Sequence, residues 1–153
     1  MAFLVPALMM NMTTILLSNV TSSIYNINAY LLTNKNHSSQ KMATFIREYD
    51  IVHKIRTIAQ FIESIHIDSE MVKTQIESIH SCIDEITKQL KIIEERLAYN
   101  KSIWILTTVR SYGFDNRIKE LEILMKVLNE RFNLLVITYK SGNESETDKS
   151  DLP

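Results

Sequence analysis

The sequence predicts an all-α protein: an antiparallel four-helix bundle with a short brace helix before the last helix. Only two glycines and two prolines occur in 153 residues, so few positions interrupt helical structure. The chain is 45% hydrophobic and 23% charged, which suits a domain with one sizeable core. Apolar residues recur every three or four positions, the spacing of a single helix face. We expect residues 1–140 to form the bundle and residues 141–153 to form a disordered acidic tail.

The first predicted helix carries no charge, because Lys35 is the first charged residue of the chain. Pro6 suits the first turn of a helix. Polar residues interrupt the apolar ones and no basic segment precedes them, so the stretch is neither a standard membrane span nor a good signal peptide. We expect a helix buried against other helices, and we keep open that it sometimes leaves them for a bilayer. Its predicted buried face consists of Leu17, Val20, Ile24, Ile27 and Leu31.

Two further helices follow a polar break at residues 33–39. The second helix is expected to bury Phe45, Tyr49, Val52, Ile55, Ile58, Ile62 and Ile65. The third carries an uninterrupted heptad seam, made of Val72, Ile76, Ile79, Ile83, Ile86, Leu90, Ile93 and Leu97. The pentapeptide IESIH occurs at 62–66 and again at 76–80, two heptads later, with its isoleucines in the seam positions. We interpret this repeat as helix geometry and not as a doubled site.

The connection between the second and third helices has two interpretations. Ser69 keeps both seams in phase, so residues 41–98 could form one rod of about 85 Å. A hairpin at residues 66–69 is favoured, because Asp68 is a good N-cap and Ile67 can pack onto Val72 as a hydrophobic staple.

The C-terminal part begins with a short apolar segment at residues 103–109, the predicted brace, in which Trp104 is expected to anchor the end of the bundle. Gly113 then breaks the chain, and Asp115 is a credible N-cap for the last helix. The predicted buried residues of that helix are Ile118, Leu121, Met125, Leu128, Phe132 and Leu135.

Charge, cysteine content and motifs argue against several classes of function. The net charge of −1 gives no support for a nucleic-acid binder. Cys82 is the only cysteine, so no internal disulfide forms, and a reducing, cytoplasmic compartment is the simplest expectation. Secretion stays a minority alternative because five Asn-x-Ser/Thr triplets occur, at Asn11, Asn19, Asn36, Asn100 and Asn143. Phosphate-binding loops and nucleophile elbows are missing, so we expect no enzyme activity and no cofactor.

Histidines and glutamates are the candidate metal ligands of this sequence. Glu63 with His66, and Glu77 with His80, both have the ExxH spacing of di-iron bundles. Those bundles need further inward carboxylates, and the first predicted helix has none. A solvated helix flank is therefore the preferred interpretation, and no metal is expected. A metal-dependent bundle enzyme, as the third alternative, predicts bound iron, manganese or zinc.

Basic residues crowd the start of the second helix and follow the uncharged first helix directly. Such bases attract anionic headgroups, which gives a hypothetical lipid-binding set and the expectation of membrane association beside a cytoplasmic location. An ordinary solvated face is the alternative. The set comprises Lys35, Lys41, Arg47, Lys54 and Arg56.

Residues 69–136 contain a long amphipathic helix, a polar joint, the apolar "SIWILTTV", a "FDNRIKEL" entry and a last helix. This pattern resembles the N-terminal four-helix bundle of the mixed-lineage kinase domain-like proteins, which is related to HeLo-type cell-death proteins. The resemblance implies a non-enzymatic bundle that oligomerises, binds acidic phospholipids and damages membranes. Two features depart from that family: no kinase or sensor domain follows, and the first helix lacks mixed charges.

The sequence therefore predicts a non-enzymatic helical-bundle effector that acts by self-association and by contact with an anionic membrane or a protein, similar to a cell-death executioner domain. Its expected partners are a second copy of the chain, an anionic membrane surface or protein partner helices, and no nucleic acid. The alternative function is a structural coiled-coil subunit of a larger assembly such as a virion, supported by the regular heptad seam.

Overall fold

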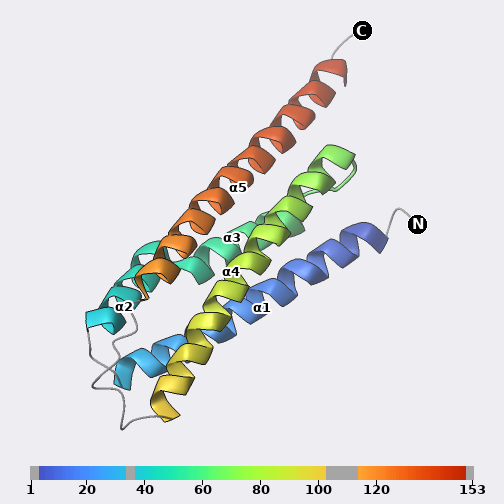
Figure 1. The fold of residues 1–153 in the computed structure, drawn as a ribbon. Coiled ribbons are helices and arrows are strands. Elements are labelled where there is room, and N and C mark those ends of the chain that lie inside the picture. Colours follow the sequence, from blue (N-terminus) through green and yellow to red (C-terminus); the bar gives the residue numbers. More distant parts are fainter. Residues whose placement is uncertain (1–3, 34–36, 103–113, 151–153) are drawn as a thin grey trace.

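Helices account for nearly all of the residues that the computed structural model describes, which are 4–33, 37–102 and 114–150. Figure 1 shows them packed side by side, with no strand among the described residues. The all-α class predicted from the sequence is thus confirmed. The helices are α1 (Leu4–Thr33), α2 (His37–Tyr49), α3 (Ile51–Ser64), α4 (Glu70–Ser102) and α5 (Asp115–Ser150).

The directions of neighbouring helices follow from the hydrogen bonds between them. Thr13 of α1 meets His80 of α4, and Asn26 of α1 meets Glu94 further along α4, so these two helices run in parallel. Between α4 and α5 the order is reversed, because Gln75 meets Thr138 whereas Gln89 meets Arg117. The helix α1 packs mainly on α4 and α3, and α5 packs mainly on α4 and also contacts α2 (Figure 1). The bundle therefore contains a parallel neighbouring pair beside an antiparallel one.

The core lies along the heptad seam of α4. All eight predicted seam residues, from Val72 to Leu97, are buried, which confirms the seam in full. Each isoleucine and leucine in the middle of the seam has 0% exposure, so the other helices must cover it from more than one side. α1 contributes Val20 and Ile27, and α5 contributes Leu121 and Leu128 to the same cluster.

The predicted second helix is divided in two at Asp50. This residue has φ 44 and ψ 55, the left-handed conformation that aspartate tolerates better than most residues. The break changes the phase of the buried stripe, so that Ile51 is buried and Val52 only half-buried. A single helix through residues 41–65 was therefore wrong, although most of its predicted core residues are buried.

The turn between α3 and α4 confirms the hairpin and excludes a continuous rod over residues 41–98. Residues 65–69 are not helical, and Ile65 has the extended conformation φ −99, ψ 155. The cap residue differs from the prediction, because the Val72 N–H donates to Ser69 Oγ at 3.1 Å. Asp68 lies one position too early to be the cap and is exposed.

α5 begins and ends differently from the sequence prediction. Asp115 is already inside its first turn, since the Ile118 N–H donates to the carbonyl of Phe114. At the other end α5 continues to Ser150, through most of the segment predicted to be a disordered tail, and Figure 1 shows this end projecting past the α3–α4 turn. The predicted brace at 103–109, with Trp104, lies outside the described residues.

Candidate functional site

The helix α1 has two different faces and no charged residue on either. Its inner face is buried in the core, and it includes the polar side chains of Thr13 and Ser23 as well as Met9, Leu16 and Val20. Its outer face leaves large apolar side chains in solvent, with exposed fractions between 48% and 79%. An uncharged helix with apolar residues on its outward side is unusual for a solvated surface. The outward residues of this kind are Leu8, Met12, Ile15, Tyr25 and Leu32.

Thr13 and His80 form the first of two polar links between α1 and α4. The Thr13 hydroxyl donates to the Met9 carbonyl at 2.9 Å, and its oxygen lies 2.6 Å from Nε2 of His80. Because a hydroxyl has only one hydrogen, the His80 Nε2–H must be the donor in the second contact. Burial lowers the pKa of His80, and the nearby carboxylate of Glu77 opposes this effect. His80 is therefore a neutral imidazole near pH 7 and works as a structural hydrogen-bond donor.

The second polar link joins Asn26 to Glu94. The Asn26 amide donates to Glu94 Oε1 at 2.7 Å, while the other carboxylate oxygen of Glu94 is buried and has no hydrogen-bond partner. The two links lie 14 residues apart on α4, which is two heptads, so they fix the register of α1 along the seam of α4.

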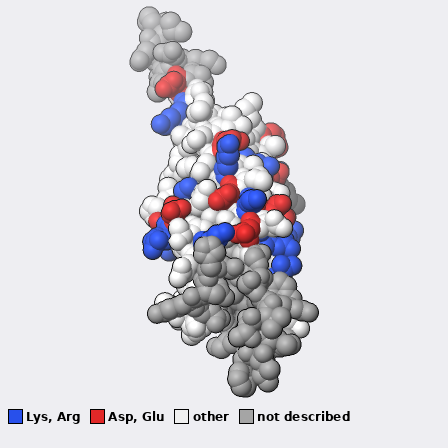
Figure 2. Space-filling model, turned by 60° about the vertical axis from the view of Figure 1, so that its left-hand side comes forward, with Lys and Arg blue, Asp and Glu red and all other residues white. Residues whose placement is uncertain are grey.

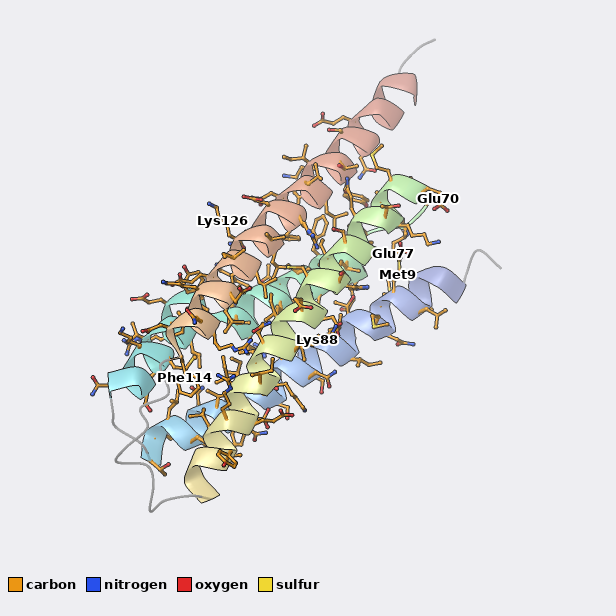
Figure 3. All side chains as sticks on the ribbon, in the orientation of Figure 1. Met9, Glu70, Glu77, Lys88, Phe114 and Lys126 are labelled. Atoms are coloured by element: carbon orange, nitrogen blue, oxygen red, sulfur yellow. The ribbon has the colours of Figure 1, made fainter. Side chains whose placement is uncertain are left out.

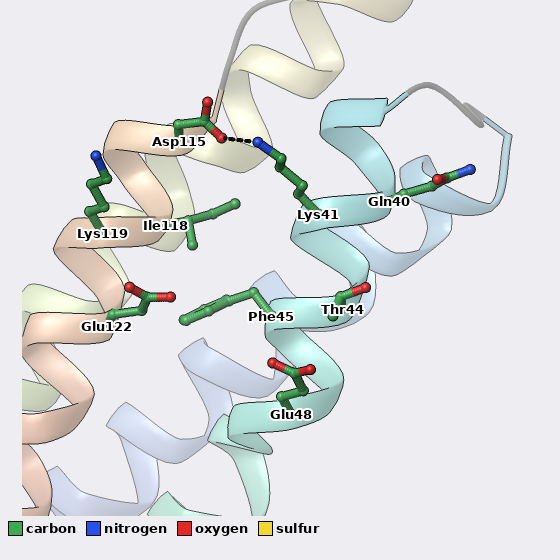
Figure 4. Close-up of a pocket in the computed structure, with 9 residues that line it drawn as sticks. All are labelled: Gln40, Lys41, Thr44, Phe45, Glu48, Asp115, Ile118, Lys119 and Glu122. Carbon is green, nitrogen blue, oxygen red and sulfur yellow. Dashed lines mark hydrogen bonds and ion pairs between the residues drawn. The ribbon is translucent and has the colours of Figure 1, made fainter.

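A cavity of about 640 Å³ lies between α2 and the start of α5. In Figure 4, Lys41 Nζ reaches across from α2 to Asp115 Oδ1 of α5, a distance of 3.2 Å, while Phe45 and Ile118 point between the helices. The glutamates Glu48 and Glu122 lie at the other end of the cavity (Figure 4). The ion pair is about half exposed on both sides and stabilises little. Charges of both signs line this cavity, so it does not select one sign of ligand charge.

A second cavity, of about 810 Å³, lies between the α3–α4 turn and the end of α5. Its lining combines His66 and Asp68 of the turn with exposed apolar side chains of Met71 and Ile137. It also contacts the last part of α5, through Tyr139, Ser141 and Asn143.

The predicted lipid-binding residues do not meet at one place. Lys41 is paired with Asp115, and the Lys54 ammonium lies over the Tyr49 ring, 5.7 Å from its centre. Arg47 and Arg56 are exposed, but they lie on different helices, α2 and α3, with the break at Asp50 between them. Lys35 lies outside the described residues. Figure 2 shows positive and negative side chains intermixed over the face that it presents.

The two Glu/His pairs that were weighed as metal ligands are also separated. Glu63, His66 and Glu77 are exposed, and so is His53, whereas His80 is engaged with Thr13. Within residues 4–33, 37–102 and 114–150, no three side chains of the types that bind metals come together.

Sequence reasoning missed the Thr13–His80 link and the outer face of α1. The signal for Thr13 is present, because Met9, Thr13, Leu16 and Val20 continue the three- and four-residue steps of the buried face toward the N-terminus. The polar residue at one of these steps, Thr13 itself, concealed the pattern. Leu17, Ile118 and Phe132, which were expected to be buried, are only half-buried. Lys126 of α5 is exposed and points away from the bundle in Figure 3.

No helix among the described residues is long and apolar enough to cross a membrane. The chain was compared with protein-family models, with curated proteins and with solved structures, and no match was found in any of the three comparisons.

Proposed function

We propose that this chain is a non-enzymatic helical-bundle effector that acts by self-association and by contact with an anionic membrane or a partner protein, similar to a cell-death executioner domain. The observation that supports this most directly is the uncharged helix α1, whose outer face leaves Leu8, Ile15, Tyr25 and Leu32 exposed. A surface of this kind loses unfavourable contact with water when another apolar surface covers it. The antiparallel order of helices that follow one another along the chain, and a short brace helix at residues 103–109 before the last helix, form part of the proposal.

The membrane part of the proposal is tested with liposomes that contain a trapped dye, with and without anionic lipid. The full chain is expected to bind and release dye only where anionic lipid is present. Arg47 and Arg56 are the exposed members of the basic set, so the double variant Arg47→Ala, Arg56→Ala is expected to lose most of this binding.

The matched control is Arg96→Ala, Lys126→Ala, which removes the same charge from exposed positions on α4 and α5. This control is expected to keep the binding of the full chain. Equal loss in both variants would mean that only net charge matters, and the basic set would then not be a site. A folded chain that neither binds nor permeabilises either kind of liposome would contradict the membrane part.

The alternative function is a structural coiled-coil subunit of a larger assembly. It is favoured by the α4–α5 hairpin, whose helices of 33 and 36 residues are long for a domain of this size. A chain that does not bind liposomes but forms ordered assemblies of many copies would support the structural subunit over the effector.

A further inference from the structure

The exposed side of α1 carries residues at heptad spacing from one end of the helix to the other. We call this set the outer stripe, and all of its members are exposed. The stripe lies along one edge of the bundle, on the side of α1 that faces away from α3 and α4 (Figure 1). It consists of Leu8, Met12, Ile15, Ser18, Ser22, Tyr25, Ala29 and Leu32.

The outer stripe has a similar order of large and small side chains when it is followed from either end. Around position 20 as the midpoint, Leu8 corresponds to Leu32, Ile15 to Tyr25, and Ser18 to Ser22. Large apolar side chains therefore occupy both ends, and small hydroxyl side chains occupy the middle. Met12 has no apolar counterpart, because position 28 is Asn, although Ala29 follows it.

We propose that the outer stripe is the surface on which two copies of this chain pair, with their α1 helices antiparallel and crossing at Ser18 and Ser22. The inference rests on the self-association in the proposed function and names its interface. Antiparallel pairing about a two-fold axis places Leu8 against Leu32 of the partner subunit and Ile15 against Tyr25 of the partner subunit. The serines meet at the crossing, where short side chains let two helix axes approach to about 8 Å.

Self-complementarity is the reason to assign the stripe to a second copy. A two-fold interface uses the same patch on both subunits, so the patch must match its own reverse. Three pairs of positions in the outer stripe, 8 with 32, 15 with 25 and 18 with 22, match in size and in polarity, a property that binding to an unrelated protein does not require. Charged side chains at the two ends of the stripe would face each other between the subunits of such a dimer. α1 carries no charged residue.

A membrane surface fits the stripe less well. Helices that lie in the bilayer interface usually place Lys or Arg on their polar side, where they meet the headgroups. The nearest polar residues of α1 are uncharged, for example Asn11 and Asn19 beside the stripe. The small central serines would also leave the middle of such a helix without an apolar anchor.

The size of the stripe is adequate for a dimer at the lower end of the usual range. The helix rises about 36 Å from Leu8 to Leu32, and its outward half presents roughly 600 Å² at the usual helix diameter. Two copies bury at most about 1,200 Å² in total through these halves, the area at which stable interfaces begin.

The interface is tested by sedimentation velocity over a range of concentrations of the full chain and of two matched variants. Ile15 and Ile123 have similar exposed fractions, 55% and 59%, but Ile123 lies on α5. The full chain and Ile123→Glu are expected to form dimers. Ile15→Glu is expected to weaken the dimer on the order of 100-fold, because each carboxylate would be buried without a partner. Circular dichroism checks that both variants keep their helix content.

The antiparallel direction is tested by disulfide trapping with mass-labelled chains. Leu8→Cys and Leu32→Cys chains, mixed under oxidising conditions, are expected to give mainly the mixed disulfide. Parallel pairing would instead join each variant to itself. Cys82 serves as the internal control, because it is buried and burial raises the pKa of its thiol, so the unsubstituted chain is not expected to cross-link.

The outcomes separate this inference from the proposed function. A chain that stays monomeric at every concentration contradicts self-association itself. A dimer that persists in Ile15→Glu, or that yields only the two self-joined disulfides, leaves self-association intact and overturns this interface. A variant that still dimerises but loses liposome binding would assign the stripe to lipid and would also overturn the inference.

Discussion

Thr13 and His80 form one of the two polar links in the largely apolar interface between α1 and α4. A buried hydroxyl costs stability when it lacks partners, and Thr13 has two, the Met9 carbonyl and the His80 ring. The charged form of His80 loses more hydration than the neutral form on burial, so folding favours the neutral imidazole. This residue therefore makes stability depend on pH.

The pH dependence has a definite sign. Burial lowers the pKa of His80 in the folded chain below its ordinary value of 6.5, so the unfolded chain takes up the proton first. The contribution of His80 is complete above about pH 6.5 and is lost as the pH falls through the folded-state pKa. We expect the free energy of unfolding to decrease between pH 7.5 and pH 5, with a slope from this group of at most about 1.4 kcal/mol per pH unit.

Urea denaturation across this range checks the expectation. His80→Gln keeps a donor toward Thr13 but cannot titrate, so its profile is expected to be flatter. His66→Gln, at an exposed position, is the control and is expected to keep the slope. The assignment fails if both variants retain the same slope as the unsubstituted chain.

Sequence spacing was sufficient to predict buried apolar residues but insufficient for buried polar ones. Every predicted seam residue of α4 is buried, because a heptad pattern of isoleucine and leucine leaves a helix no other stable face. Thr13 and Ser23 are buried because they lie on the inner face of α1, and their polar side chains give no indication of this burial in the sequence. The His80 partner of Thr13 lies on another helix, and a single sequence does not supply that pairing.

Among the elements, the division between α2 and α3 is the largest difference from prediction. Asp50 is neither glycine nor proline, so its left-handed backbone has no strong local signal. A weaker signal exists in the spacing, since Val52, Ile55 and Ile58 step by three twice in succession. Residues spaced in this way move progressively around a helix and cannot all stay on its buried face. The break at Asp50 shifts the buried face, so that Ile51 is buried together with Ile55 and Ile58, and Val52 is only half-buried. The turn at 65–69 was predictable because capping and stapling residues gather there.

The start of α4 offers a direct comparison between the cap seen in the structure and the cap expected from the sequence. Ser69→Ala removes the acceptor for the Val72 N–H and is expected to cost about 1 kcal/mol of unfolding free energy. Asp68→Ala is the matched control, and we expect it to cost no more than about 0.5 kcal/mol through its weaker interaction with the helix dipole. Chemical denaturation of both variants gives the two values. A larger loss of unfolding free energy in Asp68→Ala than in Ser69→Ala would identify Asp68 as the cap.

At the scale of the whole molecule, the bundle binds α1 by its inner face and leaves the outer stripe uncovered. Whether the candidate lipid-binding set forms one surface was not predictable, because its members lie on two helices divided at Asp50, and Lys41 is paired with Asp115 of α5. The all-α class was predictable from composition and spacing. The parallel neighbours α1 and α4 were not, since short connections alone favour antiparallel packing.

The two faces of α1 are expected to respond differently to truncation of a side chain. Ile27 is fully buried, and Ile27→Ala should lower the free energy of unfolding by about 2–4 kcal/mol. Leu32 is 79% exposed, and Leu32→Ala should change it by less than about 0.5 kcal/mol at concentrations where the chain is monomeric. Guanidinium denaturation of dilute protein provides the measurement. A small effect of Ile27→Ala would mean that α1 is only loosely held by the bundle.

The contact between the parallel helices α1 and α4 forms only late in the synthesis of the chain, because its partners are far apart in the sequence. Its two polar links join residues separated by 67 and 68 positions in the chain. A ribosome that adds about 5–20 residues per second needs roughly 3–14 seconds to make that intervening stretch. Until α4 has been made, the inner face of α1 lacks its main partner and the outer stripe lacks a cover, so α1 is most prone to non-native apolar contacts during this interval.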